Sequence, residues 1–295
     1  MVRIVLSPTE HLLGLLRCHE KVLSMTQRDR LQAGSRRRRT RLASMAIVLA
    51  LSAIGAFAPP ASAQVPIRLQ TPIVAGSTVV TSSGRCTVGA VLMRYGAGSF
   101  RSPIAAATRY LVVAKHCADH IGRQFFMNGV LIGSVTWMSG TNDVELVQVP
   151  PEVPSAQACP SYGCFVDRVP RPRAVGQVIL GPPNREARVS MLAPGSPAPG
   201  EPFCTSGSTT NTNCNWVSEP VRPPYWRSTE GLLARSTNAT GIEAGDSGGA
   251  VVSQQGTFYG IIQRGGRFLD PNLMQYLPAA EIFRQIEGTY GIAPG

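Results

Sequence analysis

After residue 63 the chain carries few side chains that can make or break covalent bonds. A histidine, an acid and a serine among them could form a catalytic set. His116 and His120 are the only histidines there, and Ser247 stands in residues 245–249, which read Gly-Asp-Ser-Gly-Gly. A serine hydroxyl is a weak nucleophile, so it needs an imidazole to take its proton and an acid to orient that imidazole. Flanking glycines let backbone N–H groups point at a bound carbonyl. This set indicates acyl transfer by a serine nucleophile, and a glycine-rich turn with a surface serine is the alternative interpretation.

The order of these residues along the chain narrows the kind of catalytic site. The nucleophile elbow of α/β-hydrolases needs a histidine after the serine, and none follows Ser247. The subtilisin order needs an aspartate before His116, and none lies in residues 64–115. The order His, Asp, Ser remains, with Asp143 leading into an apolar segment. Three further residues stay open as alternatives, the acids Asp119 and Asp167 and the base His120.

After residue 63 the chain consists of short runs that are apolar or alternate between apolar and polar residues, separated by Gly, Pro, Ser and Asn. The elements formed by these runs must position the candidate residues. Such spacing predicts an all-β barrel or sandwich. Helical spacing at residues 278–285 predicts a single C-terminal helix with Pro278 in its first turn. The Pro-rich residues 150–183 suit a surface connection between two strand-rich halves. We expect strands at residues 79–80, 87–93, 110–114, 130–137, 144–149, 178–180, 187–192, 249–252 and 257–263, in domains 73–165 and 187–295 joined by residues 166–186.

The charge of the chain is concentrated in its first 63 residues. The formal net charge is +11, of which ten Lys and Arg and three acidic residues give +7 in this leader. The arginine-rich residues 36–41, the uncharged apolar run 42–58 and Ala61-Ser62-Ala63 have the pattern of a cleaved signal peptide. An uncleaved membrane anchor is the alternative. We expect a protein that is secreted or in the cell envelope, with no stable membrane association after cleavage and no nucleic-acid partner.

Six cysteines follow the leader, and an even set in an exported chain indicates three disulfides. Their spacing alone does not choose among the many pairings. His116 and His120 are spaced like the ligands of a zinc helix, but the glutamate of H-E-x-x-H is missing. We therefore expect neither a metal nor a cofactor. The six cysteines are Cys86, Cys117, Cys159, Cys164, Cys204 and Cys214.

Three sequence blocks resemble the catalytic blocks of the chymotrypsin-like serine proteases. They are residues 111–117 (Leu-Val-Val-Ala-Lys-His-Cys), 142–147 (Asn-Asp-Val-Glu-Leu-Val) and 245–249. The resemblance spans residue 73 to the C-terminus, and its blocks follow the order of the family. It implies two six-stranded antiparallel β-barrels with a cleft between them and a short C-terminal α-helix. The implied activity is that of a secreted serine endopeptidase, a monomer that acts on protein or peptide substrates.

Further blocks are similar to the secreted bacterial branch of that family, the streptogrisins and α-lytic protease. Residues 204–210 (Cys-Thr-Ser-Gly-Ser-Thr-Thr), followed by Cys214, resemble one of its segments. Residues 73–76 (Ile-Val-Ala-Gly) and 84–89 (Gly-Arg-Cys-Thr-Val-Gly) resemble two others. The likeness implies the disulfides Cys86–Cys117 and Cys204–Cys214, and it leaves Cys159 and Cys164 for a local bridge.

The resemblance also implies the roles of the reacting groups. His116 would be the general base, Asp143 would orient it, and Ser247 would attack the substrate carbonyl. The backbone N–H groups of Gly245 and Ser247 would form the oxyanion hole. A non-proteolytic acyl hydrolase and an inactive homologue acting as a binding module are the alternatives. The implied substrate-binding residues are Gly241, Gln263, Arg264 and Gly265.

Two departures from the family pattern bear on specificity. Gly241 stands where trypsin-like enzymes have an aspartate, so cleavage after Lys or Arg is not supported. Arg264 lies in the segment that pairs with substrate backbone in the family, where its charge favours acidic side chains at the pocket entrance.

A third departure concerns the structural anchor of the serine loop. Asp246 corresponds to a buried carboxylate that takes a cationic partner in the family, and Thr205 replaces the arginine that serves in the bacterial branch. In the animal branch the partner is a new N-terminal ammonium. The sequence therefore predicts that residues 64–72 are a short propeptide whose removal lets the Ile73 ammonium bind Asp246. An unprocessed linker leading into an ordinary N-terminal strand is the alternative.

Overall fold

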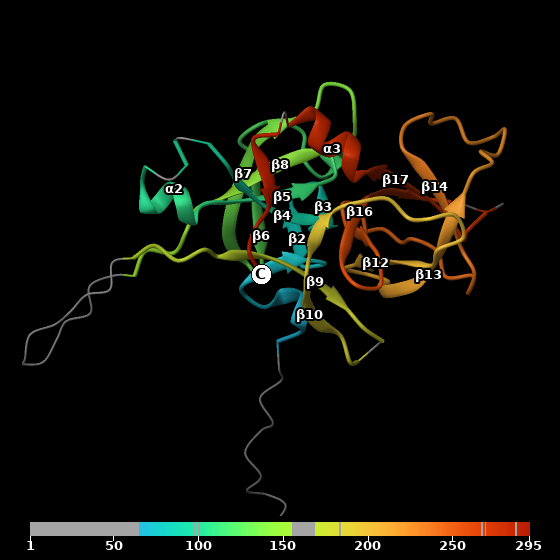
Figure 1. Cartoon of the computed structure of the whole chain (residues 1–295), viewed down its shortest axis with the longest axis horizontal. Helices are drawn as coiled ribbons and strands as arrows, with labels where there is room; N and C mark the ends of the chain where they lie inside the picture. Colours follow the sequence, from blue (N-terminus) through green and yellow to red (C-terminus); the bar gives the residue numbers. More distant parts are fainter. Residues whose placement is uncertain are drawn as a thin grey trace, which may run out of the picture. The chain divides into compact units, whose positions relative to one another are not determined.

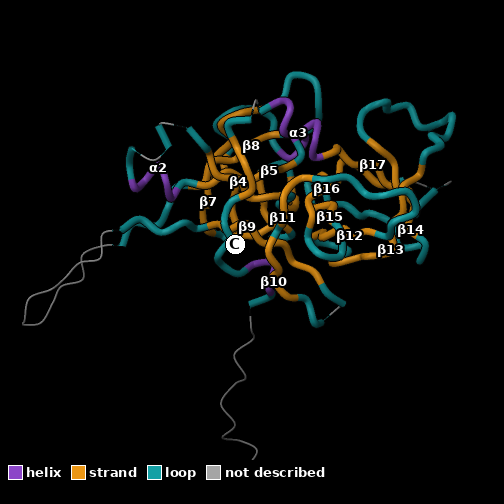
Figure 2. The backbone as a smooth tube through the Cα atoms, in the orientation of Figure 1, coloured by secondary structure: helices purple, strands orange, loops and turns teal. Residues whose placement is uncertain are grey.

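The protein is described by a computed structural model that covers residues 65–96, 98–99, 101–154, 169–182, 184–266, 268, 270–286 and 288–295. The predicted leader, Gln64, Asp167 and the predicted bridge between Cys159 and Cys164 lie outside these residues. Within them, no helix has the length and apolar character needed to cross a membrane. The described chain is built mostly of strands, with short helical segments between them (Figure 1, Figure 2).

The C-terminal half forms a closed barrel of six antiparallel strands. The strand order is β16-β15-β12-β13-β14-β17, and β16 pairs with β17 to close the ring. Large buried side chains, among them Phe203, Trp216 and Tyr276, fill its interior. Outside the ring, β11 (Leu192–Pro194) lies parallel to β16. The barrel strands are β12 (Phe203–Gly207), β13 (Asn211–Glu219), β14 (Leu232–Ser236), β15 (Ala250–Val252), β16 (Thr257–Gly265) and β17 (Leu273–Pro278).

The N-terminal half is an eight-stranded antiparallel sheet in the order β18-β4-β5-β8-β7-β6-β2-β3. One of its faces covers a core that includes Leu111, Phe125 and Val147. The last strand of the chain, β18, pairs with the outer edge of β4. The strands are β2 (Thr78–Thr81), β3 (Gly84–Thr87), β4 (Ala90–Arg94), β5 (Arg109–Val113), β6 (Gln124–Met127), β7 (Val130–Met138), β8 (Glu145–Val149) and β18 (Tyr290–Ile292).

A small third sheet lies in the order β1-β9-β10. In it, β1 (Ile73–Ala75) runs parallel to β9 (Ala174–Leu180), and β10 (Ala187–Ser190) runs antiparallel to β9. The predicted connection at residues 166–186 therefore contains a seven-residue strand, of which only the last three residues were expected. The helical segments are η2 (Ile67–Leu69), α2 (Pro103–Ala107), η3 (Lys115–Cys117) and α3 (Ala279–Gln285).

A shared hydrophobic core joins the two halves. Val112 and Leu146 of the N-terminal sheet are buried in one cluster with Ala250 and Ile261 of the C-terminal barrel. Ile282 of α3 belongs to the same cluster and is fully buried. Because burial of such side chains stabilises their mutual packing, this core sets the position of one half against the other.

The predicted all-β class and the C-terminal helix are confirmed, and the arrangement of the strands differs in detail. The C-terminal half has the expected closed six-stranded barrel. The N-terminal half is an open sheet of eight strands, with β18 at one edge and β3 at the other. The pairing of β1 with β9 is parallel, as is that of β11 with β16, so the described strands are not all antiparallel.

Candidate active site

His116 lies in the 3₁₀ turn η3, directly after β5 leaves the N-terminal sheet. The buried Ala114 comes directly before this turn, and Cys117 is the last residue of the turn. Cys117 forms a disulfide with Cys86 of β3, with Cα atoms 6.3 Å apart. The histidine is therefore held between a buried strand end and a covalent link, which restricts where its imidazole can lie.

Asp143 binds His116 through two hydrogen bonds. Its Oδ2 lies 2.7 Å from Nδ1 of the imidazole, and its Oδ1 accepts the backbone N–H of His116 at 2.9 Å. The Asp143 side chain is 14% exposed and the His116 side chain 47%. A carboxylate on Nδ1 fixes the tautomer in which Nε2 is the basic nitrogen.

Opposing effects act on the pKa of Asp143. Burial acts to raise this pKa, whereas the hydrogen bonds and charge of His116 and the positive charge of Arg264 act to lower it. The second group of effects outweighs burial, and the pKa lies below its ordinary value. Asp143 is therefore ionised at neutral pH and can stabilise a protonated imidazole.

The loop that carries Asp143 is held from both halves of the protein. Ser139 Oγ accepts the backbone N–H groups of Thr141 at 3.1 Å and Asn142 at 2.9 Å. The side-chain amide of Asn142 donates to Oε1 of Glu281 on α3 at 2.7 Å. The C-terminal helix thus helps to position the acid, a contribution that the sequence blocks did not reveal.

The loop of Ser247 packs against the segment that leads to His116. The backbone N–H of Thr87 donates to the Ser247 carbonyl at 2.9 Å. Gly248 has a φ of +82°, and a Cβ built on it would lie 2.6 Å from the Thr87 carbonyl oxygen and 2.8 Å from the backbone nitrogen of Ala114. Only glycine fits such a close approach at positive φ. The Ser247 loop therefore lies against the strand end that precedes His116, and no hydrogen bond joins the side chains of Ser247 and His116 within the described chain.

Two backbone N–H groups of this loop have no protein acceptor within the described residues, those of Gly245 and Ser247. The intervening N–H of Asp246 donates to Glu243, and that of Gly248 donates to Ile262. Gly245 is buried, has a φ of +105° and would bring a Cβ within 2.6 Å of Thr209 Oγ1. The backbone N–H groups of Gly245 and Ser247 are therefore free to donate to an oxyanion, which needs two such donors.

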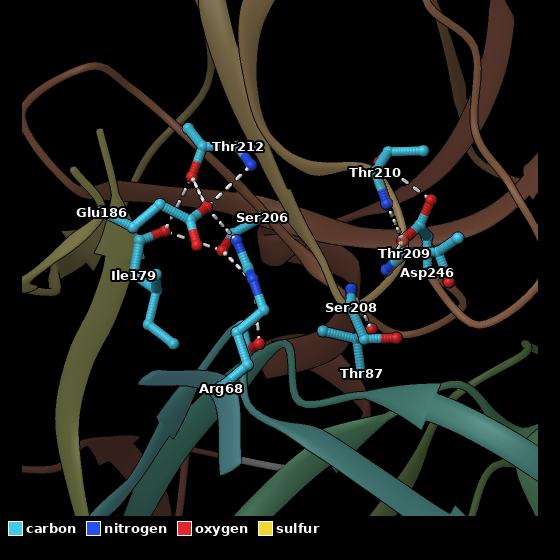
Figure 3. A network of polar contacts seen from close by, with 11 residues as sticks. Arg68, Thr87, Ile179, Glu186, Ser206, Ser208, Thr209, Thr210, Thr212 and Asp246 are labelled. Carbon is cyan, nitrogen blue, oxygen red and sulfur yellow. Dashed lines mark hydrogen bonds and ion pairs between the residues drawn. The ribbon is translucent and has the colours of Figure 1, made fainter. Parts of the chain in front are cut away.

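The buried carboxylate of Asp246 is satisfied by neutral donors, contrary to the expected cation (Figure 3). Its Oδ1 accepts the backbone N–H groups of Thr209 at 2.8 Å and Thr210 at 3.1 Å. Its Oδ2 accepts Thr210 Oγ1 at 2.9 Å and the backbone N–H of Glu243 at 3.0 Å. Several hydrogen bonds to a carboxylate stabilise its charge without an ion pair, which is why no cation is required.

The Ile73 amide does not contact Asp246 in the intact chain. It donates to the carbonyl of Arg173 at 2.9 Å, where β1 meets β9. Ile73 itself is fully buried. The predicted pairing of an Ile73 ammonium with Asp246 thus stays a prediction for a processed chain.

The predicted substrate-binding residues lie along the end of β16. A Cβ on Gly265 would lie 2.7 Å from the carbonyl oxygen of Ile242, which places Gly265 beside the residue that follows Gly241. Arg264 is exposed and close enough for its charge to act on Asp143. Arg264 therefore lies within electrostatic reach of the His116–Asp143 pair.

Gln263 differs from its neighbours, because its side chain is buried in a polar chain of contacts. Its Oε1 accepts Gln275 Nε2 at 2.8 Å, and Trp226 Nε1 donates to Gln275 Oε1 at 2.8 Å. Its Nε2 has no partner within the described residues. The sequence blocks did not indicate Gln275 or Trp226, which lie on distant parts of the chain.

Searches of solved structures find the same fold in bacterial proteases. A Nocardiopsis protease is 19% identical with a TM-score of 0.50, and the match covers 75% of this chain and 98% of the other. Thermobifida fusca Protease A is 18% identical with a TM-score of 0.50 at the same coverage. A protein described as a glutamic acid specific serine protease that utilizes a novel histidine triad in substrate binding is 19% identical, with a TM-score of 0.51, covering 75% and 100%.

The fold is that of the chymotrypsin-like serine proteases. No family model and no curated protein sequence matches the chain. The likeness is therefore one of tertiary structure, and it agrees with the order of the sequence blocks.

Two of the alternative residues, Asp119 and His120, lie on the surface of this chymotrypsin-like fold. Asp119 Oδ1 lies 2.7 Å from His120 Nδ1, and the same carboxylate binds Arg123. The side chains of Asp119 and His120 are 57% and 58% exposed. Since Asp119 contacts His120 rather than His116, the structure does not bring either alternative to Ser247. No group of three or more metal-ligating side chains occurs in the described part of the chain.

The chymotrypsin-like fold also buries an acid that the sequence did not single out. Glu145 is fully buried two residues after Asp143, and neither of its carboxyl oxygens has a hydrogen-bond partner among the residues that the structure describes. Burial raises the pKa of Glu145 to about 9, and the negative charges of Asp143 and Asp119 add to the shift while Lys115 opposes it. Glu145 is therefore protonated at neutral pH. The sequence signal that could have identified Glu145 is its position in the block 142–147, which also carries Asp143.

Proposed function

We propose that the protein is a serine endopeptidase that hydrolyses peptide bonds through an acyl-enzyme intermediate. The observation that supports this most is the Asp143–His116 hydrogen-bonded pair with the Ser247 loop packed against the same strand end. The alternative interpretation, a glycine-rich turn with a surface serine, does not explain three features. These are the acid that orients His116, the positive-φ Gly248 against Ala114, and the two free N–H donors. The chymotrypsin-like fold adds that proteins of this architecture carry out this chemistry.

In the proposed mechanism each group has one task. His116 Nε2 takes the hydroxyl proton as Ser247 Oγ attacks the substrate carbonyl carbon, and Asp143 stabilises the imidazolium that forms. The free N–H groups of Gly245 and Ser247 donate to the carbonyl oxygen as it becomes negative. The imidazolium then gives its proton to the leaving amine as the C–N bond breaks. Water, deprotonated by His116, hydrolyses the ester and restores Ser247.

The substrate class follows from the strand beside the site. Residues 263–265 end a strand whose last residues can pair with an extended peptide, which suits a protein or peptide substrate. An ester or another acyl group would use the same reacting atoms but would leave this edge unused. A monomer is sufficient for the proposed reaction, since all the groups named belong to one chain, and no nucleic acid or cofactor enters it.

The two disulfides of the described chain support an extracellular location. Cys86 bonds to Cys117, and Cys204 bonds to Cys214 across neighbouring strands with Cα atoms 3.8 Å apart. Disulfides persist in oxidising compartments. Export by the signal peptide in residues 1–63 remains part of the proposal.

Labelling with a fluorophosphonate probe tests the function directly. The folded protein should form one covalent adduct at Ser247, detected by mass spectrometry of peptides, and it should cleave an unstructured protein substrate. Ser247→Ala should form no adduct, and Ser253→Ala, a change to a serine outside the loop, should be labelled like the wild type. Absence of an adduct in the folded wild type would exclude the enzyme and favour the binding module, whereas an adduct without peptide cleavage would favour a different acyl hydrolase.

Arg264 is expected to favour substrates with an acidic side chain next to the scissile bond. Replacing it by glutamine should lower kcat/KM for a peptide with glutamate there about 5- to 10-fold relative to the matched glutamine peptide, because one exposed charge contact is lost. The ratio of the two kcat/KM values is the measurement. Arg185→Gln removes an exposed charge from the turn between β9 and β10 and should leave the ratio unchanged. An unaltered ratio in the Arg264 variant would exclude this residue from specificity.

A further inference from the structure

A buried arginine lies in the segment that the sequence marked as a short propeptide. Arg68 belongs to η2, and its side chain is 6% exposed. Its Nη1 donates to the Gly76 carbonyl at 2.8 Å and to Ser206 Oγ at 3.2 Å, and its Nη2 binds Oε1 of Glu186. The guanidinium thus joins the N-terminal segment to β12 of the C-terminal barrel and to the turn before β10.

Strands β12 and β13 form a hairpin. Arg68 contacts β12, and its partner Glu186 contacts β13 (Figure 3). Glu186 Oε1 accepts the backbone N–H of Thr212 at 3.0 Å and Thr212 Oγ1 at 2.8 Å. Ser206 and Thr212 are directly paired across β12 and β13. The Glu186 side chain is 9% exposed, and Arg68 supplies the positive charge beside it.

The turn of this hairpin holds the serine loop. Ser208 Oγ donates to the Gly245 carbonyl at 2.8 Å, and Thr209 Oγ1 donates to the Ala244 carbonyl at 2.8 Å. The hydrogen bonds from Thr209 and Thr210 to Asp246 come from the same turn. Figure 3 shows two groups of contacts, one with Arg68, Glu186, Ser206 and Thr212 and the other with Asp246, Thr209 and Thr210.

Cleavage before Ile73 would disturb this arrangement. If residues 65–72 then dissociated, Glu186 would lose its counter-ion and keep only the two donors of Thr212, which is destabilising for a buried carboxylate. Cleavage would also create an ammonium at Ile73, a fully buried residue whose N–H has a backbone carbonyl as its acceptor. Asp246 meanwhile has four neutral donors and does not require that ammonium.

We propose that residues 65–72 remain in the working enzyme as an N-terminal strap, and that Arg68 is a positioning residue for the oxyanion loop. The strap fixes the β12–β13 hairpin through Glu186 and Ser206, and the hairpin turn fixes Gly245 and Asp246. Cleavage between Pro72 and Ile73 inactivates the enzyme instead of activating it. This inference rests on the proposed function of Ser247.

Probe labelling combined with kinetics tests the strap. Arg68→Met keeps the length of the side chain without its charge, and the double variant Arg68→Met/Glu186→Met also removes the orphaned carboxylate so that the fold is retained. Both should show a 10- to 100-fold lower kcat per titrated active site with little change in KM, because the oxyanion donors are displaced. Arg185→Met is the matched control, since Arg185 is exposed in the turn between β9 and β10, and its kcat should equal that of the wild type.

The outcomes separate this proposal from the proposed function. A purely structural role would lower Tm and leave kcat per titrated site unchanged in the double variant, which would overturn the proposal. N-terminal sequencing of the probe-labelled secreted protein should give a start at or before Val65, and a start at Ile73 would overturn it as well. If the wild type is not labelled at all, the proposed function fails and the strap loses its role with it; if the wild type is labelled and Arg68→Met is labelled equally fast, the strap proposal alone fails.

Discussion

Replacing Asp143 by asparagine is expected to lower kcat for peptide hydrolysis about 10⁴-fold at neutral pH. The reason lies in the two hydrogen bonds of this side chain. The backbone N–H of His116 needs an acceptor oxygen, so the asparagine carbonyl would replace Oδ1 and the NH₂ group would face Nδ1. Nδ1 would then be the acceptor nitrogen, and Nε2 would carry the proton. An imidazole in that tautomer cannot take the Ser247 proton.

The measurement is kcat on a peptide substrate, together with the rate of fluorophosphonate labelling. Asp119→Asn is the matched control, because Asp119 is exposed and binds His120 and Arg123 away from His116. Its kcat should equal that of the wild type. If Asp119→Asn lost activity while Asp143→Asn retained it, the acid of the site would be Asp119.

Replacing Glu145 by glutamine is expected to stabilise the protein increasingly as the pH rises. Burial raises the pKa of Glu145 to about 9 in the folded state, against an ordinary value of 4.5. Between these values the folded state holds a proton that the unfolded state has released, so the free energy of unfolding falls as the pH rises. The loss is about 1.4 kcal/mol for each pH unit in that window, and it stops above pH 9.

The glutamine variant has no proton to lose at this position. Its Tm should exceed that of the wild type by an amount that grows between pH 5 and pH 8, by about 2 to 4 °C for each kcal/mol in a chain of this size. Glu152→Gln, at an exposed site, should follow the wild-type curve at every pH. Parallel Tm curves for Glu145→Gln and the wild type would show that the Glu145 carboxyl is ionised in the folded protein.

The charges around Glu145 show why its carboxyl group is neutral in the folded protein. Asp143 and Asp119 raise its pKa and Lys115 lowers it, so an ionised Glu145 would place a second negative charge two residues from the acid that orients His116. Lys115 donates to the Ser139 carbonyl at 2.8 Å and does not bind the carboxyl. The structure therefore keeps Glu145 neutral by burial and not by an ion pair.

The candidate reacting residues could be found from the sequence because each stands in a short local block. His116 precedes a cysteine at the end of an apolar run, Asp143 precedes another such run, and Ser247 lies between glycines. Strand alternation and turn residues also sufficed for the all-β class and for the helix near the C-terminus. Several strands were missed, among them the apolar β17 and the polar β13, which reads Asn-Thr-Asn-Cys-Asn-Trp-Val-Ser-Glu. The pattern of burial of β13 depends on the barrel that surrounds it.

The sequence by itself determined the types and order of the chemical groups, since these depend only on local residues, and it determined the charge of the leader. The tertiary structure alone decided the partners of buried charges. Asp246 received neutral donors from a hairpin turn, Glu186 received Arg68 from a segment 118 residues away, and Glu145 received no hydrogen-bond partner from the described residues. The cost of a buried charge depends on which distant groups fold against it, and no local pattern specifies those groups.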